Sequence, residues 1–292
     1  MEVYRTPDER FEGLPGWTFE PCYLEQDGLR MHYVDAGSGA PVLLLHGEPT
    51  WAYLYRKMIP RLARGARVVA PDYFGFGRSD KPTRVEDYSY DFHYTSIERF
   101  ADELDLRDTT VVVQDWGGPI GLRLAAERPD RVTRLVILNT GIGAGRAPSP
   151  EWLRFREFVR RVGTDLVPGQ LIRISCLSDP GDEVIEAYNA PFPTPESKAG
   201  VLAFPELVPT EMDHPNAAKM LEVRSALARW ERPALVLFSD SDPIFSPRAA
   251  ERMAELVPGA GPAEIVAGAA HFLQEEKGEE IAERIVRFLG GT

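Results

Sequence analysis

The stretch that decides the fold is Val111-Val112-Val113-Gln114-Asp115-Trp116-Gly117-Gly118-Pro119-Ile120-Gly121. It begins with three valines, and such a run of β-branched residues is typical of a buried parallel strand. It then passes through Asp115 and two glycines into residues 122–128, which are rich in leucine and alanine and favour a helix. The stretch therefore predicts a strand, a sharp turn and a helix, with Asp115 at the turn.

A turn of this kind presents one side chain at the end of a parallel sheet, where a serine hydrolase carries the serine of Gly-x-Ser-x-Gly. Here the position holds Asp115, so the expected nucleophile is a carboxylate. A carboxylate can displace a leaving group from sp³ carbon and form an ester with the enzyme. Asp115 could alternatively be a helix N-cap, but the two glycines after a buried strand favour the nucleophile elbow.

Short apolar segments and helical segments alternate on both sides of this elbow. A hairpin is predicted over residues 19–35, further strands over 42–45, 67–70, 132–138, 234–238 and 263–267, and helices over 53–63, 91–105, from 247 and over 278–289. Between residues 141 and 223 the alternation stops, and proline clusters separate helical segments. The pattern predicts an α/β domain with a mostly parallel sheet, formed by residues 1–140 and 224–292, and an inserted helical cap at 141–223.

The composition excludes several classes of protein. A net charge of −12 argues against a nucleic-acid groove. The only cysteines, Cys22 and Cys176, are far apart and form neither a disulfide framework nor a metal-binding spacing, so a reduced cytoplasm is expected. The sequence shows no secretory signal and no apolar run long enough to span a membrane.

Polar residues that can carry chemistry follow four of the predicted strands. They are Glu48 after His-Gly, Asp115 with Trp116, Asp242, and His271. The order of nucleophile, acid and histidine is that of α/β-hydrolase triads. His271, held by Asp242, is expected to activate the water that cleaves the ester.

The sequence also bears on the identity of the triad acid and on the groups that would stabilise an oxyanion. Asp240 competes with Asp242 for the role of triad acid, and the register favours Asp242. The backbone N–H groups of Glu48 and Trp116 occupy the positions at which such hydrolases stabilise an oxyanion.

The leaving group is suggested by Trp116, whose indole N–H can donate a hydrogen bond to a departing halide. A halide needs no proton, whereas an epoxide oxygen needs an acid, usually a tyrosine of the cap. Tyr188 is the only tyrosine in residues 141–223. A halide is therefore favoured over an epoxide, and no metal or organic cofactor is expected.

The chain resembles the haloalkane dehalogenases of the α/β-hydrolase superfamily over nearly its full length. The resemblance rests on His46-Gly47-Glu48-Pro49-Thr50-Trp51, Asp72-Tyr73-Phe74-Gly75-Phe76-Gly77-Arg78-Ser79-Asp80-Lys81-Pro82, Gln114-Asp115-Trp116-Gly117-Gly118, Tyr188-Asn189-Ala190-Pro191-Phe192-Pro193 and His271-Phe272-Leu273-Gln274-Glu275. The subgroup that it resembles most has glutamate after His-Gly and an Asp-His-Asp triad, which Glu48 and Asp242 fit. The resemblance implies an α/β-hydrolase fold, a small apolar halogenated substrate and release of a halide ion.

One position departs from the pattern of that subgroup. The resemblance implies a second halide-binding tryptophan in the first cap helix, and Phe155 stands at that position. Phenylalanine has no N–H donor. Trp152, one helical turn earlier, is the alternative donor.

Three functions remain open from the residues. The leading one is hydrolysis of haloalkanes through an ester on Asp115; the second is epoxide or ester hydrolysis on the same triad. The third is a non-catalytic small-molecule-binding homologue, which has no need of a complete set of Asp115, Asp242 and His271. The sequence contains no feature that distinguishes a monomer from a homo-oligomer.

Overall fold

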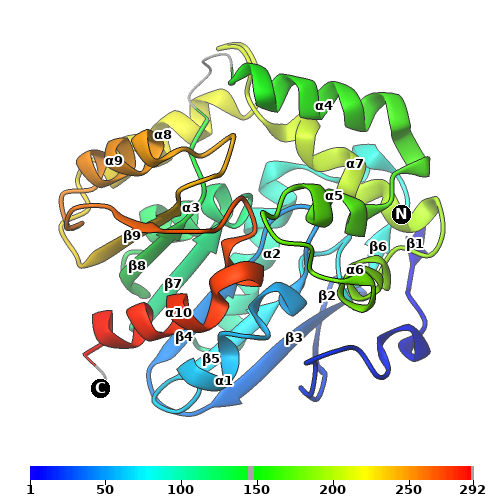
Figure 1. Ribbon diagram of the computed structural model, residues 1–292, viewed down its shortest axis with the longest axis horizontal. Helices are drawn as coiled ribbons and strands as arrows, with labels where there is room; N and C mark the ends of the chain where they lie inside the picture. The colour runs from blue at the N-terminus through cyan, green and yellow to red at the C-terminus, as the bar shows by residue number, and fades with distance from the viewer. Residues whose placement is uncertain (144–147, 291–292) are drawn as a thin grey trace.

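The computed structural model describes residues 1–143 and 148–290 (Figure 1). Its centre is an eight-stranded sheet with the strand order β10-β9-β8-β7-β4-β5-β3-β2. The strands are β2 (Cys22–Gln26), β3 (Leu29–Gly37), β4 (Pro41–Leu45), β5 (Arg67–Pro71), β7 (Thr109–Gln114), β8 (Val132–Leu138), β9 (Ala234–Ser239) and β10 (Glu264–Val266). Neighbours from β10 to β5 run parallel, and β2 and β3 join antiparallel. The predicted, mostly parallel sheet is confirmed.

A small second sheet pairs β1 (Val3–Tyr4) with β6 (Lys81–Pro82). Short 3₁₀ helices punctuate the loops: η1 (Asp8–Phe11), η2 (Ala52–Tyr55), η3 (Val85–Asp87), η4 (Gly163–Asp165), η5 (Glu196–Lys198) and η6 (Phe204–Leu207). No helix in the described part of the chain is long and apolar enough to cross a membrane.

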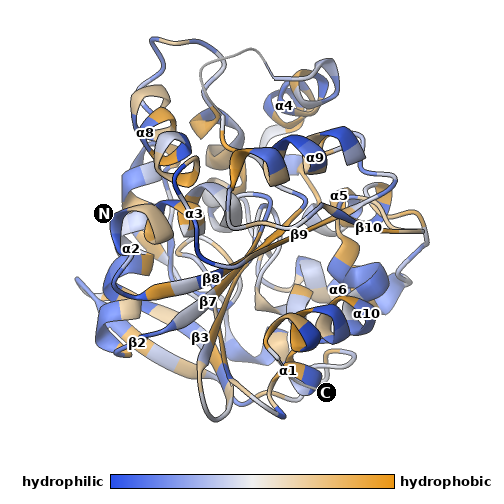
Figure 2. Cartoon of the chain, turned by 90° about the vertical axis from the view of Figure 1, so that its left-hand side faces the viewer, coloured by the Kyte–Doolittle hydropathy of each residue, from blue (hydrophilic) through white to orange (hydrophobic). Residues whose placement is uncertain are grey.

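Alternate residues of each central strand pack on opposite faces of the sheet. On β7, Val111 and Val113 join one apolar cluster, whereas Val112 joins the other. The first cluster includes α2 (Tyr90–Glu103), α3 (Gly117–Glu127) and α9 (Pro247–Leu256); the second includes α1 (Ile59–Leu62) and α10 (Leu273–Phe288). Because both faces are covered, the strands read as continuous apolar runs, and Figure 2 shows hydrophobic colour along the strands inside the molecule.

The segment between β8 and β9 is helical, as the sequence predicts. It contains α4 (Pro150–Val162), α5 (Pro168–Ile174), α6 (Asp182–Asn189), α7 (Ala199–Ala203) and α8 (Ala217–Leu227). Figure 1 shows α4, α5 and α7 on the side of the molecule away from α1. The predicted end of the cap at residue 223 falls inside α8, which packs against α3.

Two predicted helices differ from those in the structure. The segment 53–63 forms η2 and the short α1 rather than one helix, and Pro60 lies in the first turn of α1, where its missing N–H costs nothing. The last helix begins at Leu273 rather than at residue 278. Lys277 leaves the helical conformation (φ −132°, ψ 27°), so the prediction captured only the part beyond this kink.

Candidate active site

Asp115 occupies a strained turn between β7 and α3. Its φ is 48°, a left-handed conformation that is uncommon for any residue other than glycine. Close packing requires the two glycines that follow: a Cβ on Gly117 would lie 2.0 Å from the carbonyl oxygen of Leu45, and one on Gly118 would lie 1.8 Å from Oγ1 of Thr140. Thr140 also donates a hydrogen bond to the Asp115 carbonyl at 2.6 Å. The predicted elbow is therefore present, and its neighbours hold it in place.

The two carboxylate oxygens of Asp115 have different surroundings. Oδ1 accepts a hydrogen bond from the backbone N–H of Glu48 at 2.9 Å, and the backbone N–H of Trp116 also binds this carboxylate. Oδ2 lies 3.7 Å from Nε2 of His271. Burial raises the pKa of Asp115 above its ordinary value, although His271 and the two N–H groups counteract this effect.

His271 lies between the two acids that the sequence assigned to it. Its Nδ1 is 2.8 Å from Oδ2 of Asp242, whose Oδ1 accepts the backbone N–H groups of Ile244 and Phe245. Burial alone would lower the pKa of His271, but the charges of Asp242 and Asp115 outweigh it and the pKa is raised. With Asp242 at Nδ1, the neutral ring carries its proton there and leaves Nε2 facing Asp115 as a base.

The alternative acid, Asp240, serves a different purpose. Its carboxylate accepts hydrogen bonds from the backbone N–H groups of Gly268 and Ala269, in the loop before His271. It is exposed, whereas Asp242 is buried. Of the two aspartates, Asp242 contacts His271.

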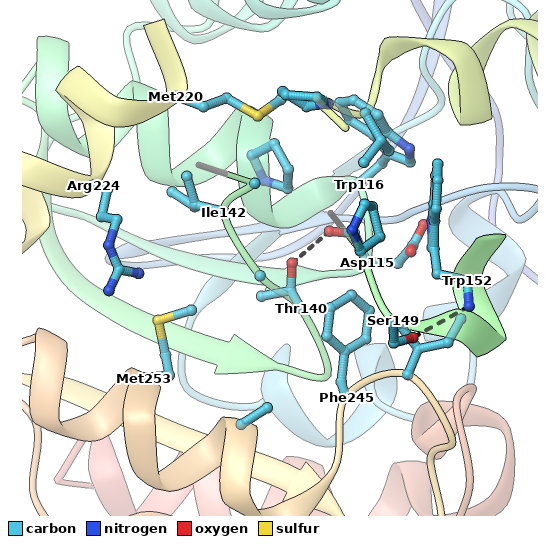
Figure 3. Close-up of a pocket in the computed structure, with 18 of the residues that line it drawn as sticks. Asp115, Trp116, Thr140, Ile142, Ser149, Trp152, Met220, Arg224, Phe245 and Met253 are labelled. Atoms are coloured by element: carbon cyan, nitrogen blue, oxygen red, sulfur yellow. Dashed lines mark hydrogen bonds between the residues drawn. The ribbon is translucent and has the colours of Figure 1, made fainter. Parts of the chain in front are cut away.

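A small cavity of about 70 Å³ lies beside these residues. It is lined by Glu48, Asp115, Trp116, Trp152, Phe155, His271 and apolar side chains of the cap and core. A larger cavity of about 390 Å³ shares Asp115, Trp116 and Trp152 with it and extends toward α8 and α9 (Figure 3). The site is thus a narrow, mostly apolar space that opens into a wider one.

Both tryptophans considered as halide donors line both cavities, whereas Phe155 lines only the small one. Trp116 packs against Phe204, with ring centroids 4.9 Å apart. In the part of the chain that the structure describes, neither indole N–H donates to a protein acceptor. Two donors therefore remain available to a ligand.

Two side chains near Asp115 and His271 have surroundings that the sequence did not predict: Gln114, to which it assigned no role, and Glu48, for which it assigned only the backbone N–H. Gln114, the last residue of β7, donates from Nε2 to the carbonyl oxygen of His271 at 3.2 Å and lies 3.3 Å from its Nε2. The side chain of Glu48 is buried, and its Oε1 has no partner among the described residues. Burial and the charge of Asp115 raise the pKa of Glu48 well above its ordinary value, which favours the neutral acid.

Tyr188, considered as an acid for an epoxide, lines neither cavity. It is fully buried, and its hydroxyl donates to Oε2 of Glu275 at 2.7 Å. Glu275 also accepts two hydrogen bonds of 2.6 Å from Arg56. Tyr188 thus joins the cap to α10 and lies away from the space that a substrate would occupy.

Three known proteins that are similar to this chain are named haloalkane dehalogenases. Residues 40–170 match the family described as alpha/beta hydrolase fold. The chain is 44% identical to the haloalkane dehalogenase of Mycobacterium marinum, over 98% of this chain and 99% of that protein. It is also 44% identical to the haloalkane dehalogenase of Psychrobacter cryohalolentis, over 99% of this chain and 98% of that one. The tetrameric haloalkane dehalogenase DpaA from Paraglaciecola agarilytica superposes with a TM-score of 0.92 at 35% identity, over 97% of each chain.

Proposed function

The chain belongs to the haloalkane dehalogenase family of hydrolases, and from this premise we propose how its own residues carry out the reaction. The substrate is a small molecule with a carbon–halogen bond, and the products are an alcohol, a halide ion and a proton. One observation carries the assignment: in the Asp115 carboxylate, Oδ1 accepts a hydrogen bond from the backbone N–H of Glu48, and Oδ2 lies near Nε2 of His271. Each oxygen serves a different step.

In the first step Oδ2 of Asp115 attacks the carbon that bears the halogen. The new C–O bond forms as the carbon–halogen bond breaks, and the halide leaves with the bonding electron pair. Because burial removes water from the carboxylate, less solvent must be stripped from it during the attack. The product is an alkyl ester of Asp115 whose carbonyl oxygen is Oδ1.

In the second step water cleaves this ester. His271 takes a proton from the water at Nε2, and Asp242 stabilises the resulting imidazolium. As hydroxide adds to the Asp115 carboxyl carbon, Oδ1 becomes an oxyanion that already faces the N–H of Glu48. One such donor contributes about 3–4 kcal/mol to the transition state. Collapse of this adduct expels the alkoxide, which takes the proton from His271 and leaves as the alcohol. The carboxylic acid of Asp115 that remains loses its proton to solvent, which restores the carboxylate.

For the halide we propose a site between the indole N–H groups of Trp116 and Trp152. The support is that both side chains line the cavity next to Asp115 and neither N–H has a described protein acceptor. Phe155 offers only apolar contact. In this proposal the chain has an Asp-His-Asp triad, and the second halide donor is one helical turn away from the position that the subgroup resemblance implies. Residues 141–223 form the cap that supplies it.

The experiment that tests the assignment combines His271→Phe with a brominated alkane. Alkylation of Asp115 should proceed and hydrolysis should stop, so the protein should gain the mass of the alkyl group on the peptide that contains Asp115. His271→Phe combined with Asp115→Asn is the matched control and should gain no mass. Halide release with no adduct on Asp115 would contradict the covalent mechanism.

A further inference from the structure

The larger cavity has a charged side that the reaction described above does not use. Its wall includes Arg224 of α8 and Arg252 of α9, together with apolar side chains such as Met220 and Met253. In Figure 3 the side chain of Arg224 extends from α8 into this space, opposite Asp115 and Trp116. A cavity that contains a nucleophile at one end therefore has cations at the other.

Neither arginine is engaged by the protein. No carboxylate of residues 1–143 or 148–290 forms an ion pair with Arg224 or Arg252. Most other arginines of this acidic chain do have such partners; Arg160, for example, binds Glu206, and Arg284 binds Glu280. Both Arg224 and Arg252 are exposed to solvent, so their charges are neither buried nor neutralised.

The lining between the two ends is apolar. Ile142, Met220, Met253 and Leu256 lie along this cavity. A ligand that satisfies all of these surfaces has an apolar chain and an anionic group. A guanidinium binds a carboxylate with two parallel hydrogen bonds, which makes a carboxylate the best match to an arginine pair.

We propose that the preferred substrates of this protein are halogenated carboxylates, with the halogen at the end of the chain remote from the carboxylate. Arg224 and Arg252 bind the carboxylate while the carbon that bears the halogen reaches Asp115. This inference rests on the proposed function, because it extends the same site. The arginines do not take part in the chemical steps; they select and orient the substrate.

The test compares a series of ω-bromocarboxylates with the corresponding ω-bromo primary amides of the same chain length. The amides have almost the same shape as the carboxylates but no charge. Arg224→Gln, Arg252→Gln and the double variant should lower kcat/KM for the carboxylates, mainly through KM. Because an exposed ion pair is weak, loss of each arginine should lower kcat/KM for the carboxylates on the order of twofold to fivefold, and the double variant should lower it further. Turnover of the amides should fall less than turnover of the carboxylates, and the remaining amide turnover shows that the variants are folded.

Arg248→Gln is the matched control. Arg248 lies on α9, is exposed, and lines neither cavity. Its loss should leave the ratio of carboxylate to amide turnover unchanged. An unreactive alkanoate should also inhibit turnover of a neutral bromoalkane competitively, and more weakly in the double variant than in the wild type.

Two results would overturn the inference. In the first, the carboxylate-to-amide ratio is the same in the wild type and the double variant, whether or not both substrates slow. The wild type then still releases bromide from the amides, so the proposed function stands and only the carboxylate site fails. If the wild type released bromide from neither substrate series nor from bromoalkanes, the proposed function and the inference would both be wrong.

Discussion

In the proposed mechanism, the different surroundings of the two Asp115 oxygens determine which of them forms the ester. Oδ1 accepts a hydrogen bond from the Glu48 N–H, whereas Oδ2 lies 3.7 Å from Nε2 of His271. Alkylation at Oδ2 leaves Oδ1 in its hydrogen bond, where it becomes the oxyanion of the second step. A single preorganised donor set thus serves the resting carboxylate, the ester and the tetrahedral adduct.

The variant Gly47→Ala tests whether activity depends on the hydrogen bond between the Asp115 carboxylate and the Glu48 N–H. A Cβ at this position would lie 2.2 Å from Oδ1 of Asp115, so Gly47→Ala must displace the carboxylate from the Glu48 N–H. Because a displacement of about 1 Å can cost on the order of 100-fold in rate, kcat should fall by about that factor. The measurement is bromide release, with circular dichroism as the control for folding. A folded variant with the wild-type rate would show that the contact is not needed.

The pH dependence follows from the charges around His271. Burial lowers its pKa, but Asp242 and Asp115 together raise it above the ordinary value. Only neutral His271 can accept the water proton, so ester hydrolysis should slow as the pH falls through this pKa. In the ester Asp115 is uncharged, and one of the two raising charges is lost. The pKa that governs hydrolysis should therefore be lower than the pKa of His271 in the free protein.

Rapid quenching followed by mass spectrometry measures the fraction of esterified protein at each pH, and NMR gives the titration of His271 in the free protein. Ester should accumulate toward low pH. A hydrolysis midpoint above that of the free protein would mean that Asp115 does not carry the ester.

Trp152 provides the test of the halide site. Trp152→Phe should remove a hydrogen bond to the departing halide, a loss of about 1.5–3 kcal/mol in transition-state stabilisation. Chlorinated substrates should suffer more than brominated ones, since chloride leaves less easily. The double variant Trp152→Phe/Phe155→Trp moves the donor by one turn of α4 and should recover part of the activity. Equal rates for wild type and Trp152→Phe would exclude Trp152 as a donor.

The roles of Asp115, Asp242 and His271 could be proposed from the sequence because each follows a strand of a parallel sheet, and such strand ends meet at one edge. Gln114 could not be recognised in this way. It continues a buried strand in the sequence, and only the fold brings its amide to the carbonyl oxygen of His271.

At the scale of the elements, the cap is fastened to the sheet-flanking helices by a buried polar cluster. Tyr188 of α6 donates to Glu275 of α10, and Glu275 in turn binds Arg56 and Lys57. Glu275 lies four residues after His271, at the start of α10. The same cluster thus joins α6 to the start of α10, the helix that follows His271.

Tyr188→Phe removes one hydrogen bond to a buried carboxylate and should lower the free energy of unfolding by about 1.5–3 kcal/mol. Because Tyr188 does not line the cavities, kcat for bromoalkanes should stay within about twofold of the wild type, a difference of less than 1 kcal/mol in barrier. Urea unfolding and bromide release measure the two effects separately. Loss of turnover in a stably folded variant would place Tyr188 in the chemistry.

The sequence predicted the strands better than the helices at this scale. Alternate residues of β7 and β8 pack on opposite faces of the sheet, and helices cover both faces. Such strands need continuous apolar sequences, which can be recognised without knowing which elements pack against them. The helix at 278–289 was found without its first turns because Lys277 interrupts the helical conformation there. The burial of Tyr188 could not be predicted, because its contact with Glu275 joins residues that are far apart in the sequence.

At the scale of the whole molecule, Asp115 and His271 follow strands of the sheet. The segment between β8 and β9 supplies part of the cavity wall, and α9 with the loop before it supplies another part. The order of strands and helices predicted this division, since the alternation of apolar and helical segments breaks after β8 and resumes at β9. The charge of the larger cavity could not be predicted. In the sequence, Arg224 and Arg252 are indistinguishable from other exposed residues of two separate helices, and only the fold places them around one cavity.

The central claim is that Asp115 itself, and not a water molecule, attacks the substrate carbon. The most direct measurement is a single turnover of a bromoalkane by the wild-type protein in heavy-oxygen water. The account predicts that the alcohol contains ordinary oxygen, taken from Asp115, and that the Asp115 peptide gains one heavy oxygen from the water that cleaves the ester. Heavy oxygen in the alcohol of the first turnover, with an unlabelled Asp115, would contradict it.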